Sequence, residues 1–262
     1  MGSGVRSGTH FATASFGKGR NRMNRPYMIC HILSALNGKI SGSFMGTASN
    51  RQIGKEYAAI RNAYQADAWL YGTTTTKEFT GFRVPVYSQK DYTVPAGDFI
   101  AKKDAELYYV SIDTEGEIGW ESGTCRRAGC PDAHVIEVVT GSTPVSYLAY
   151  LRKHGVSYIM AGENSLDCQI AVKKLYQLFG IRRVLICGGG VVNWSFLQQG
   201  VVDELSLLLS PSADGENDTP SIFENSIYLQ ASAPVEFNLE DVQRIGKSGL
   251  RLVYSVPQKT ER

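Results

Sequence analysis

The sequence predicts an α/β fold built around a mostly parallel central sheet, with an antiparallel portion near its C-terminal end. Short apolar runs rich in β-branched residues alternate along the chain with longer segments of helical character. That alternation is typical of βαβ units, in which helices connect parallel strands. The last two expected strands, 202–210 and 249–256, have no clear helix between them, and we therefore expect an antiparallel arrangement there.

The N-terminal half opens with a strand and a helix. Residues 26–36 (PYMICHILSAL) are an apolar run that ends at Asn37-Gly38, a strong turn signal. The Gly/Ser-rich loop 39–47 is flexible enough to fold over a ligand. Segment 50–65 places its apolar residues on one face with charges between them, which predicts a helix. Strands at 68–71 and 107–112 and a long loop over 80–104 complete this half.

The C-terminal half alternates strands and helices more regularly. No repeat or linker divides residues 23–262, so one domain is expected there. Residues 1–22 are rich in Gly, Ser and Arg and contain no acid, and they are expected to be a disordered extension or a cloning remnant. The expected strands are 133–139, 157–161 and 183–187, and the expected helices are 144–154, 169–179 and a helix that follows the glycines at 188–190 and ends by Gly200.

Three consecutive glycines, Gly188 to Gly190, follow the apolar strand and precede an apolar helix that contains Asn193 and Trp194. Glycine has no side chain to hold an anion away, and the free N–H groups and positive end of a helix attract one. This arrangement predicts a nucleotide or phosphate site. A tight strand-to-helix turn without a ligand explains it equally well, because neither the spaced glycines of a Rossmann fingerprint nor a P-loop is present.

A second strand end has similar chemistry. Gly72 follows the strand at 68–71 and is itself followed by four threonines, Thr73 to Thr76. Their hydroxyls and free N–H groups suit an anion. A run of helix N-cap residues is an equally good interpretation of the same threonines.

The composition is that of an ordinary globular protein. The chain has 262 residues, of which 43% are hydrophobic and 20% charged, and a net charge of +2, which gives no case for a nucleic acid or a membrane as partner. Five cysteines and no secretory segment indicate a reducing, cytoplasmic location. Cys125, Cys130 and His134 are close in sequence, but no second pair completes a zinc set, so no metal is expected.

Three blocks of the sequence together resemble one known family. Residues 25–29 (RPYMI) and 34–39 (SALNGK) are similar to the R-P-Y-V…S-L-D-G-K opening of the riboflavin-biosynthesis reductase domain. Residues 67–72 (DAWLYG), followed by threonines, resemble its D-A-I-L-V-G…T block. Residues 188–194 (GGGVVNW) and 200–205 (GVVDEL) resemble its G-G-G-T-L-N-W…G-L-V-D-E-L segment. The order and spacing of these blocks identify a member of that superfamily, which has the three-layer dihydrofolate-reductase fold.

The resemblance implies an NADPH-dependent reductase that transfers hydride to a small heterocyclic substrate, similar to 5-amino-6-(5-phosphoribosylamino)uracil reductase of riboflavin biosynthesis. It also implies a homodimer. The implied cofactor-binding residues are Gly72, Thr73, Thr75, Asp113, Thr114, Gly188, Gly189, Gly190, Val191, Val192 and Asn193. The implied substrate-binding residues are Ser41, Ser43, Arg61, Arg83 and Cys187, and the catalytic candidates are His31, Asn37 and Lys39.

Several of these residues have a second interpretation from their chemistry alone. His31 is a candidate proton donor because the ordinary histidine pKa lies near physiological pH, and a packed histidine on a strand is the alternative. Lys39 suits a phosphate or carboxylate, or is a solvated loop lysine. Arg83 suits a bidentate anion clamp, or is a surface charge.

The chain departs from the family pattern at four positions. Asn37 stands where the family usually has Asp, and a neutral amide cannot exchange a proton near physiological pH. Cys187 stands where many members have Glu, and Arg61 lies two positions before the usual helix arginine. Glu115 would repel a 2′-phosphate, so NADH is not excluded. These departures keep two alternatives open: a reductase of another substrate, and a dinucleotide-binding protein without catalysis.

Overall fold

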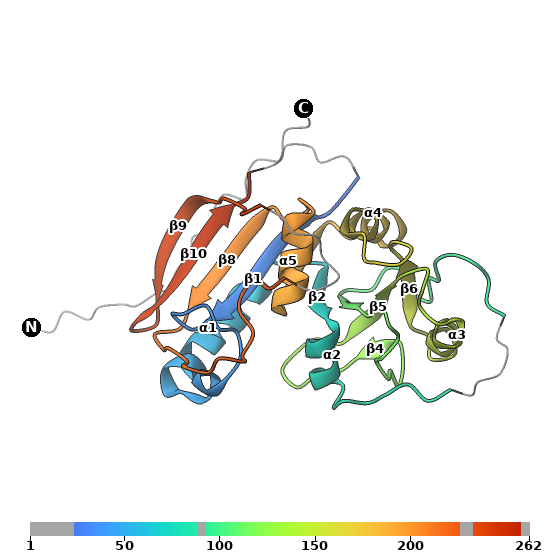
Figure 1. The fold of residues 1–262 in the computed structure, drawn as a ribbon, viewed down its shortest axis with the longest axis horizontal. Helices are drawn as coiled ribbons and strands as arrows, with labels where there is room; N and C mark the ends of the chain where they lie inside the picture. The colour runs from blue at the N-terminus through green and yellow to red at the C-terminus, as the bar shows by residue number, and fades with distance from the viewer. Residues whose placement is uncertain (1–23, 88–92, 226–232, 258–262) are drawn as a thin grey trace, which may run out of the picture.

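The computed structural model describes residues 24–87, 93–225 and 233–257 (Figure 1). Strands and short helices alternate along most of the chain. The strands are β1 (Tyr27–Ser34), β2 (Ala68–Gly72), β3 (Tyr108–Ile112), β4 (Thr124–Cys125), β5 (Ala133–Val139), β6 (Ser157–Met160), β7 (Arg183–Ile186), β8 (Glu204–Leu209), β9 (Asn238–Ile245) and β10 (Gly249–Ser255). The helices are α1 (Ala48–Ala63), α2 (Thr73–Phe79), α3 (Val145–Lys153), α4 (Cys168–Phe179), α5 (Gly190–Gln198) and the 3₁₀ turn η1 (Ser43–Gly46).

All ten strands join one sheet, in the order β4-β5-β3-β2-β7-β1-β8-β10-β9, with β6 also paired to β5. The pairs among β6, β5, β3, β2, β7, β1 and β8 are parallel. The pairs β8–β10, β10–β9 and β4–β5 are antiparallel. The predicted mostly parallel sheet with an antiparallel C-terminal portion is therefore confirmed. Because parallel strands run the same way, the loops that follow them emerge at one edge of the sheet.

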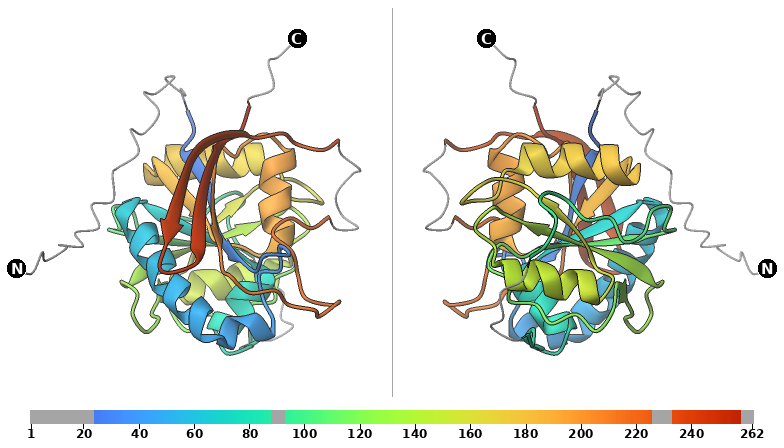
Figure 2. Two further views of the ribbon diagram at one scale, coloured as in Figure 1. Left: turned by 90° about the vertical axis from the view of Figure 1, so that its left-hand side faces the viewer. Right: turned by 90° about the vertical axis from the view of Figure 1, so that its right-hand side faces the viewer.

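Helices cover both faces of the sheet, which gives three layers. On β1, Met28, Cys30 and Ile32 belong to the core that packs under α4 and α5. Their neighbours Ile29 and Leu33 belong to the core under α1 and α3. This alternation follows from the two-residue period of a strand. Figure 2 shows α4 and α5 on one side of the strands and α1 and α3 on the other.

Several parts of the structure differ from the sequence prediction, among them the two-residue strand β4, which was not predicted. Strand β9 was not predicted, because seven of its eight residues are exposed or half-buried and its sequence, NLEDVQRI, has no buried apolar run. Backbone pairing with β10, rather than burial, defines this edge strand. The expected loop 39–47 contains η1 and an isolated bridge between Lys39 and Ser221. The other predicted elements are present, with ends shifted by one or two residues.

A pair of buried carboxyl groups lies under the loop after β3. Asp113 accepts hydrogen bonds from the amides of Gly116 and Ile118 at 3.1 and 3.0 Å and from the hydroxyl of Tyr147 at 2.9 Å. Glu137 is fully buried, accepts a hydrogen bond from the indole of Trp120, and leaves its Oε2 without a partner among the described residues. Burial, with Asp113 nearby, raises the pKa of Glu137 well above its ordinary value.

Replacing Glu137 with Gln is expected to stabilise the protein above neutral pH. Because the native pKa of Glu137 is raised, the protonated side chain makes its full contribution to the free energy of unfolding below the ordinary glutamate pKa of about 4.3. This contribution is lost as the pH rises through the native pKa. Glu137→Gln removes that loss, on the order of 1 kcal/mol per pH unit across the titration. Thermal unfolding from pH 5 to 9 measures it, and a variant whose curve parallels the wild type would contradict the account.

Candidate functional site

Two helices begin next to each other at the edge where the parallel strands end. α2 starts after β2 with Gly72 as its N-cap, and α5 starts after β7 with Gly189 as its N-cap. Neither N-cap has a side chain that accepts a helix amide, whereas Thr47 caps α1 and Asp167 caps α4. The first-turn amides of α2 and α5 therefore have no side-chain acceptor at the N-cap, which is the chemistry of an anion site.

The glycine turn, Gly188–Gly190, needs glycine at two of its three positions. Gly188 has φ 103°, a left-handed conformation that side chains disfavour, and the Gly188–Gly189 peptide is cis. A Cβ on Gly190 would lie 2.3 Å from the carbonyl oxygen of Ser221. A Cβ on Gly189, in contrast, would meet only the hydroxyl of Thr75, at 3.9 Å. The surface at Gly189 is therefore open, and it faces α2.

Gly72 fixes the spacing between the two helices. Its amide donates to the carbonyl of Gly188 at 3.1 Å. A Cβ at this position would lie 2.7 Å from Cγ2 of Val192. The structure thus brings together three predicted cofactor positions, Gly72, Thr75 and Gly189. The helix N-cap interpretation of the threonines is wrong, because Gly72 is the N-cap and the threonines lie inside α2, which begins at Thr73.

Other predicted cofactor residues have structural partners. Thr73 donates its hydroxyl to the carbonyl of Ile112 at 2.7 Å, which ties α2 to β3. The Asp113 carboxylate is engaged in its own loop, as described above. Thr114 is half-buried beside the exposed Glu115. At this edge the hydroxyl of Thr114, rather than the carboxylate of Asp113, remains available to a ribose or phosphate.

The first turn of α5 divides its side chains between core and surface. Val191 is exposed and Val192 is buried. Asn193 is fully buried and donates from Nδ2 to the carbonyl of Ile222 at 2.8 Å. Asn193 therefore anchors α5 to the segment that follows β8, and any contact of these three residues with a cofactor is through backbone or through Val191.

The loop after β1 is held to the loop after β8 by one carboxylate. Asp214 is buried and accepts from the amide of Phe44 at 3.0 Å and from the hydroxyl of Ser43 at 3.2 Å. These hydrogen bonds, led by those from the backbone amides, lower the pKa of Asp214. The side chain of Asn37 donates to the carbonyl of Asp214. Lys39 donates to the carbonyl of Thr219 at 2.7 Å.

The segment 214–219 thus accepts hydrogen bonds from three predicted site residues, Asn37, Lys39 and Ser43. Ser41 lies between them and is half-buried. These contacts are those of a pinned loop, and the roles predicted for these residues in catalysis and substrate binding stay predictions. Asp214 was not singled out in the sequence because an Asp-Gly pair in a polar stretch is indistinguishable from an ordinary turn.

His31 lies in the core rather than at a surface. Its Nδ1 is 3.1 Å from Oγ of Ser206, its Nε2 is 3.1 Å from the carbonyl of Tyr57, and its ring stacks on that of Tyr57 at 4.3 Å. Burial, with smaller contributions from Arg251 and Arg61, lowers its pKa to about 3. This is the geometry of the packed-histidine interpretation, and a neutral His31 at physiological pH has no proton to donate beyond its hydrogen-bonded N–H.

Arg83 is on the surface. It forms an ion pair with Glu121 at 2.9 Å, and its side chain is 45% exposed. Its carbonyl accepts from the amide of Gly119 at 2.9 Å. These contacts are those of the surface-charge interpretation, and the predicted contact of Arg83 with a substrate stays a prediction.

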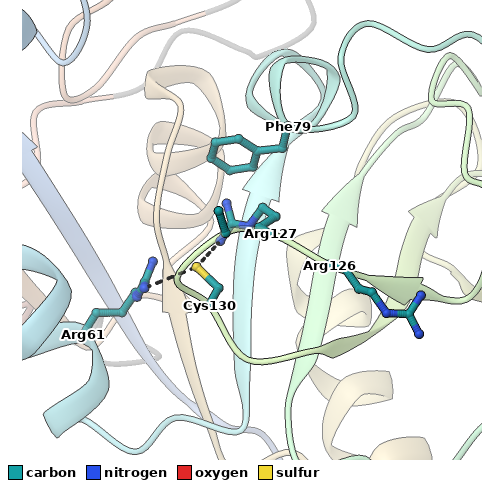
Figure 3. Close-up of a pocket in the computed structure, with 6 residues that line it drawn as sticks. Arg61, Phe79, Arg126, Arg127 and Cys130 are labelled. Carbon is teal, nitrogen blue, oxygen red and sulfur yellow. Dashed lines mark hydrogen bonds between the residues drawn. The ribbon is translucent and has the colours of Figure 1, made fainter.

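Cys187 lies at the end of β7, directly before the glycine turn, on the face covered by α1. Burial raises the pKa of its thiol, and the neighbouring Tyr57, Arg61, Tyr71 and Arg127 oppose that shift. Two of these neighbours, Arg61 and Arg127, also line an open pocket of about 450 Å³. We call it the cationic pocket; its lining residues are Arg61, Phe79, Arg126, Arg127, Ala128 and Cys130 (Figure 3).

Sequence reasoning considered Cys130 only as a zinc ligand and overlooked Arg127. Cys130 instead accepts hydrogen bonds from Arg61 and Arg127, each at 3.6 Å. His134 is bonded to Ser157 at 2.7 Å. In the ranges that the structure describes, no three His, Cys, Asp or Glu side chains gather as a metal site. The adjacent arginines Arg126 and Arg127 were the available signal, but only the fold shows that one of them turns inward.

Solved structures with the same architecture are known, and they define its class. A pyrimidine reductase-like protein from Corynebacterium diphtheriae superposes with a TM-score of 0.64 at 19% identity, over 90% of this chain and 94% of that one. The riboflavin biosynthesis reductase of Saccharomyces cerevisiae superposes with a TM-score of 0.58 at 16% identity, over 91% and 93% of the two chains. The predicted three-layer dihydrofolate-reductase-like fold is therefore confirmed.

Sequence comparison finds similar proteins as well. Residues 124–250 match the RibD C-terminal domain family. The 2,5-diamino-6-ribosylamino-4(3H)-pyrimidinone 5′-phosphate reductase of Methanothermobacter thermautotrophicus is 22% identical over 231 residues, which are 85% of this chain and 95% of that protein. The reductase of the same name from Archaeoglobus fulgidus is 27% identical over 233 residues, with the same coverage. The chain is thus similar to the RibD C-terminal domain over these residues, and its resemblance to the riboflavin-biosynthesis reductases is confirmed.

Alanine at Gly189 and at Gly190 is expected to have opposite effects. Gly189→Ala adds a methyl group to an open surface, so thermal stability stays within about 2 °C while the dissociation constant for NADPH rises at least about tenfold, since the methyl group occupies the approach to the amides. Gly190→Ala forces its Cβ against the Ser221 carbonyl and destabilises the protein by roughly 1–3 kcal/mol. Thermal unfolding measures the stability of both variants, and nicotinamide fluorescence titration measures their affinity for NADPH. A Gly189→Ala variant that binds NADPH as tightly as the wild type would refute the predicted cofactor contact at Gly189.

Acid is expected to destabilise the protein partly through His31. The unfolded chain takes up a proton on this histidine below about pH 6.5, whereas the native state does so only near its pKa of about 3. The contribution of His31 to the free energy of unfolding is therefore complete above pH 6.5. It falls by up to about 1.4 kcal/mol per pH unit as the pH drops. His31→Gln should flatten urea-denaturation stabilities between pH 6.5 and 4. His134, whose pKa burial lowers to about 4, retains its own share of the slope.

Proposed function

We propose that this protein is a nicotinamide-dinucleotide-dependent reductase of a phosphorylated pyrimidine, in the class of the 2,5-diamino-6-ribosylamino-4(3H)-pyrimidinone 5′-phosphate reductases that it resembles. The observation that carries the proposal is the meeting of two uncapped helix starts, α2 and α5, across Gly72 and Gly189. The similarity to reductases along 85% of the chain supports the reaction class.

The residues present fit the diphosphate of a dinucleotide. The amides of the α5 first turn face an opening at Gly189 that any larger residue would narrow, and Thr75 adds a hydroxyl at 3.9 Å from that opening. When bound, the dinucleotide supplies the hydride, and the protein supplies alignment. Gly189–Val191 and Thr75 would hold the diphosphate, and Thr114 would meet the ribose of the adenosine end.

NADPH is the proposed cofactor, and the loop after β3 decides the preference over NADH. Glu115 is exposed there, next to Thr114. A carboxylate at this place opposes a 2′-phosphate through charge repulsion. No arginine or lysine within residues 113–117 offsets it. We therefore propose that the protein uses NADPH, and that its preference for NADPH over NADH is weaker than in a site that presents a cation to the 2′-phosphate.

The pocket beside Cys187 is the proposed place of the pyrimidine ring. Cys187 neighbours Arg61 and Arg127 of the pocket lining. Together with the adjacent Tyr57 and Tyr71 it offers neutral hydrogen-bonding groups, and it directly precedes the glycine turn. Asn37 and the buried His31 are not placed to carry a proton across neutral pH. We therefore assign the proton that accompanies the hydride to water that enters the open pocket, with the chain's own residues acting in binding and orientation.

Two further proposals concern the assembly and the alternative function. The β9–β10 hairpin exposes Leu239, Val242 and Leu250, and we propose that this apolar edge pairs with a second copy, which light scattering can test. Catalytic loss is the alternative, because His31, Asn37 and Lys39 all have structural hydrogen bonds.

The longest described helix, α1, has 16 residues, and none of those described has the length and hydropathy of a membrane span.

Turnover with defined substrates tests the proposed function. NADPH oxidation at 340 nm should occur with 2,5-diamino-6-ribosylamino-4(3H)-pyrimidinone 5′-phosphate or with the deaminated 5-amino-6-(5-phosphoribosylamino)uracil, and not with dihydrofolate. NADH should support the reaction with no more than about a hundredfold loss, near 2.7 kcal/mol. Binding of NADPH without oxidation by either pyrimidine would favour the catalytically inactive alternative, and oxidation with dihydrofolate alone would reassign the substrate.

A further inference from the structure

Cys130 presents its thiol to the cationic pocket between two guanidinium groups. Arg61 reaches the pocket from α1, and Arg127 reaches it from the loop between β4 and β5. Both donate to Sγ of Cys130 at 3.6 Å (Figure 3). The amide of Cys130 donates to the carbonyl of Arg127 at 3.1 Å, which fixes the cysteine and this arginine in one turn. Since Cys130 is half-buried and lines an open pocket, a small molecule that enters the pocket reaches its sulfur.

The other four cysteines have a different environment. Cys30, Cys168 and Cys187 are buried, and Cys125 is half-buried on β4. Burial raises the pKa of all four of these thiols, and so disfavours the thiolate form that reacts. Among the described residues, Cys130 is the cysteine that accepts hydrogen bonds from guanidinium groups and lines an open pocket. A partly exposed thiol beside positive groups has the environment of a reactive cysteine.

The positive charge around this sulfur is not compensated within the pocket. Arg61 is only 9% exposed, its guanidinium lies 3.9 Å above the ring of Trp69, and its Nε has no hydrogen-bond partner among the described residues. The pocket lining contains no acidic residue. Within the part of the chain that the structure describes, neither Arg61 nor Arg127 forms an ion pair with a carboxylate. The pocket therefore attracts a negatively charged reagent toward Sγ of Cys130.

The neighbouring Arg126 shows the contrasting case. It is exposed, it forms an ion pair with Asp132 at 3.0 Å, and it points away from Cys130 in Figure 3. Its charge is compensated outside the pocket, one residue along the chain from Arg127. Arg126 is therefore a matched control for the effect of a guanidinium group on the thiol.

We propose that Cys130 is a site of reversible S-thiolation, and that its reagent is a small disulfide that carries carboxylates, of the class of oxidised glutathione. The Cys130 thiolate attacks one sulfur of the reagent, whose S–S bond breaks as the new S–S bond to Sγ forms. The Cys130 sulfur is oxidised, and the departing sulfur is reduced and leaves as a thiolate. That thiolate takes a proton from water, and water receives the proton that Cys130 loses. Guanidinium groups bind carboxylates, so Arg61 and Arg127 hold the reagent against the sulfur.

Thiolation at this place would change the use of the pocket. The adduct would occupy the space between Arg61 and Arg127, where the pyrimidine is proposed to bind. Turnover would then stop in the thiolated protein and return when dithiothreitol removes the adduct. This consequence rests on the proposed function, whereas the adduct itself does not.

Intact-mass measurement and peptide mapping of the purified full-length chain, after incubation with oxidised glutathione at low ionic strength, test the site. We expect one glutathionyl group, located on Cys130 and released by dithiothreitol. Cystamine, a cationic disulfide, should react with Cys130 at least about tenfold more slowly, because the guanidinium groups repel it. Arg127→Gln should slow glutathionylation at least about fivefold, since it removes one of the two positive groups. Arg126→Gln should change the rate less than about twofold.

Two cysteine variants locate the reaction. Cys130→Ser should take up no glutathionyl group, and Cys125→Ser should be labelled at the rate of the wild type. Labelling that is confined to another cysteine would overturn the proposal. A product with an internal Cys125–Cys130 disulfide and no adduct would also overturn it, because Cys125 would then replace the external reagent as the partner.

The rates and the turnover assay give the remaining outcomes. Equal rates with oxidised glutathione and cystamine, or an unchanged rate in Arg127→Gln, would each contradict the proposal. Because Arg127 lies on a loop, its variant keeps the test meaningful even where Cys130→Ser lowers the melting temperature. Thiolation of Cys130 in a protein without any pyrimidine turnover would keep the site and remove the reductase function. Pyrimidine turnover in a protein whose Cys130 takes up no adduct would keep the function and remove the site.

Discussion

The parallel pairing of β2 with β7 is the constraint on which the rest of the structure depends. Because the register joins Ala68 to Val184 and Leu70 to Ile186, the two strands end side by side at one edge of the sheet. Each is followed at once by a helix whose N-cap is glycine. Neither helix can satisfy its first amides through a capping side chain, and the absence of side chains at Gly72 and Gly189 lets the two helix starts approach each other. Helix amides without a capping side chain at one opening suit an anion, and we propose that the anion is the diphosphate of the cofactor.

The face of the sheet under α1 has a complementary character. Its strands carry aromatic and hydroxyl-bearing side chains, and the loop between β4 and β5 brings Arg127 across them to meet Arg61. The glycine turn thus presents backbone amides, and the cationic pocket presents guanidinium groups. Cys187, which directly follows β7, lies near Arg61 and Arg127 and directly precedes the glycine turn.

Most of the architecture could be read from the sequence, and the side-chain chemistry could be read only in part. Strand and helix periodicity, with glycine and threonine at two strand ends, was sufficient to predict the sheet, its mixed topology and the glycine turn. Strand β9 was missed because its stabilising partner is β10, not a buried face. His31 drew attention as a titratable residue, but its environment of Tyr57 and Ser206 is set by tertiary packing. Arg127 and Asp214 gain their positions from loops, whose course no periodicity predicts.

A crystal structure of the protein with NADPH bound would test the central claim most directly. The account predicts the diphosphate against the first-turn amides of α5, within hydrogen-bonding distance of the Gly189–Val191 backbone and the Thr75 hydroxyl, with the nicotinamide directed toward Cys187. A diphosphate bound at any other edge of the sheet, or a glycine turn that remains empty at saturating NADPH, would contradict the account.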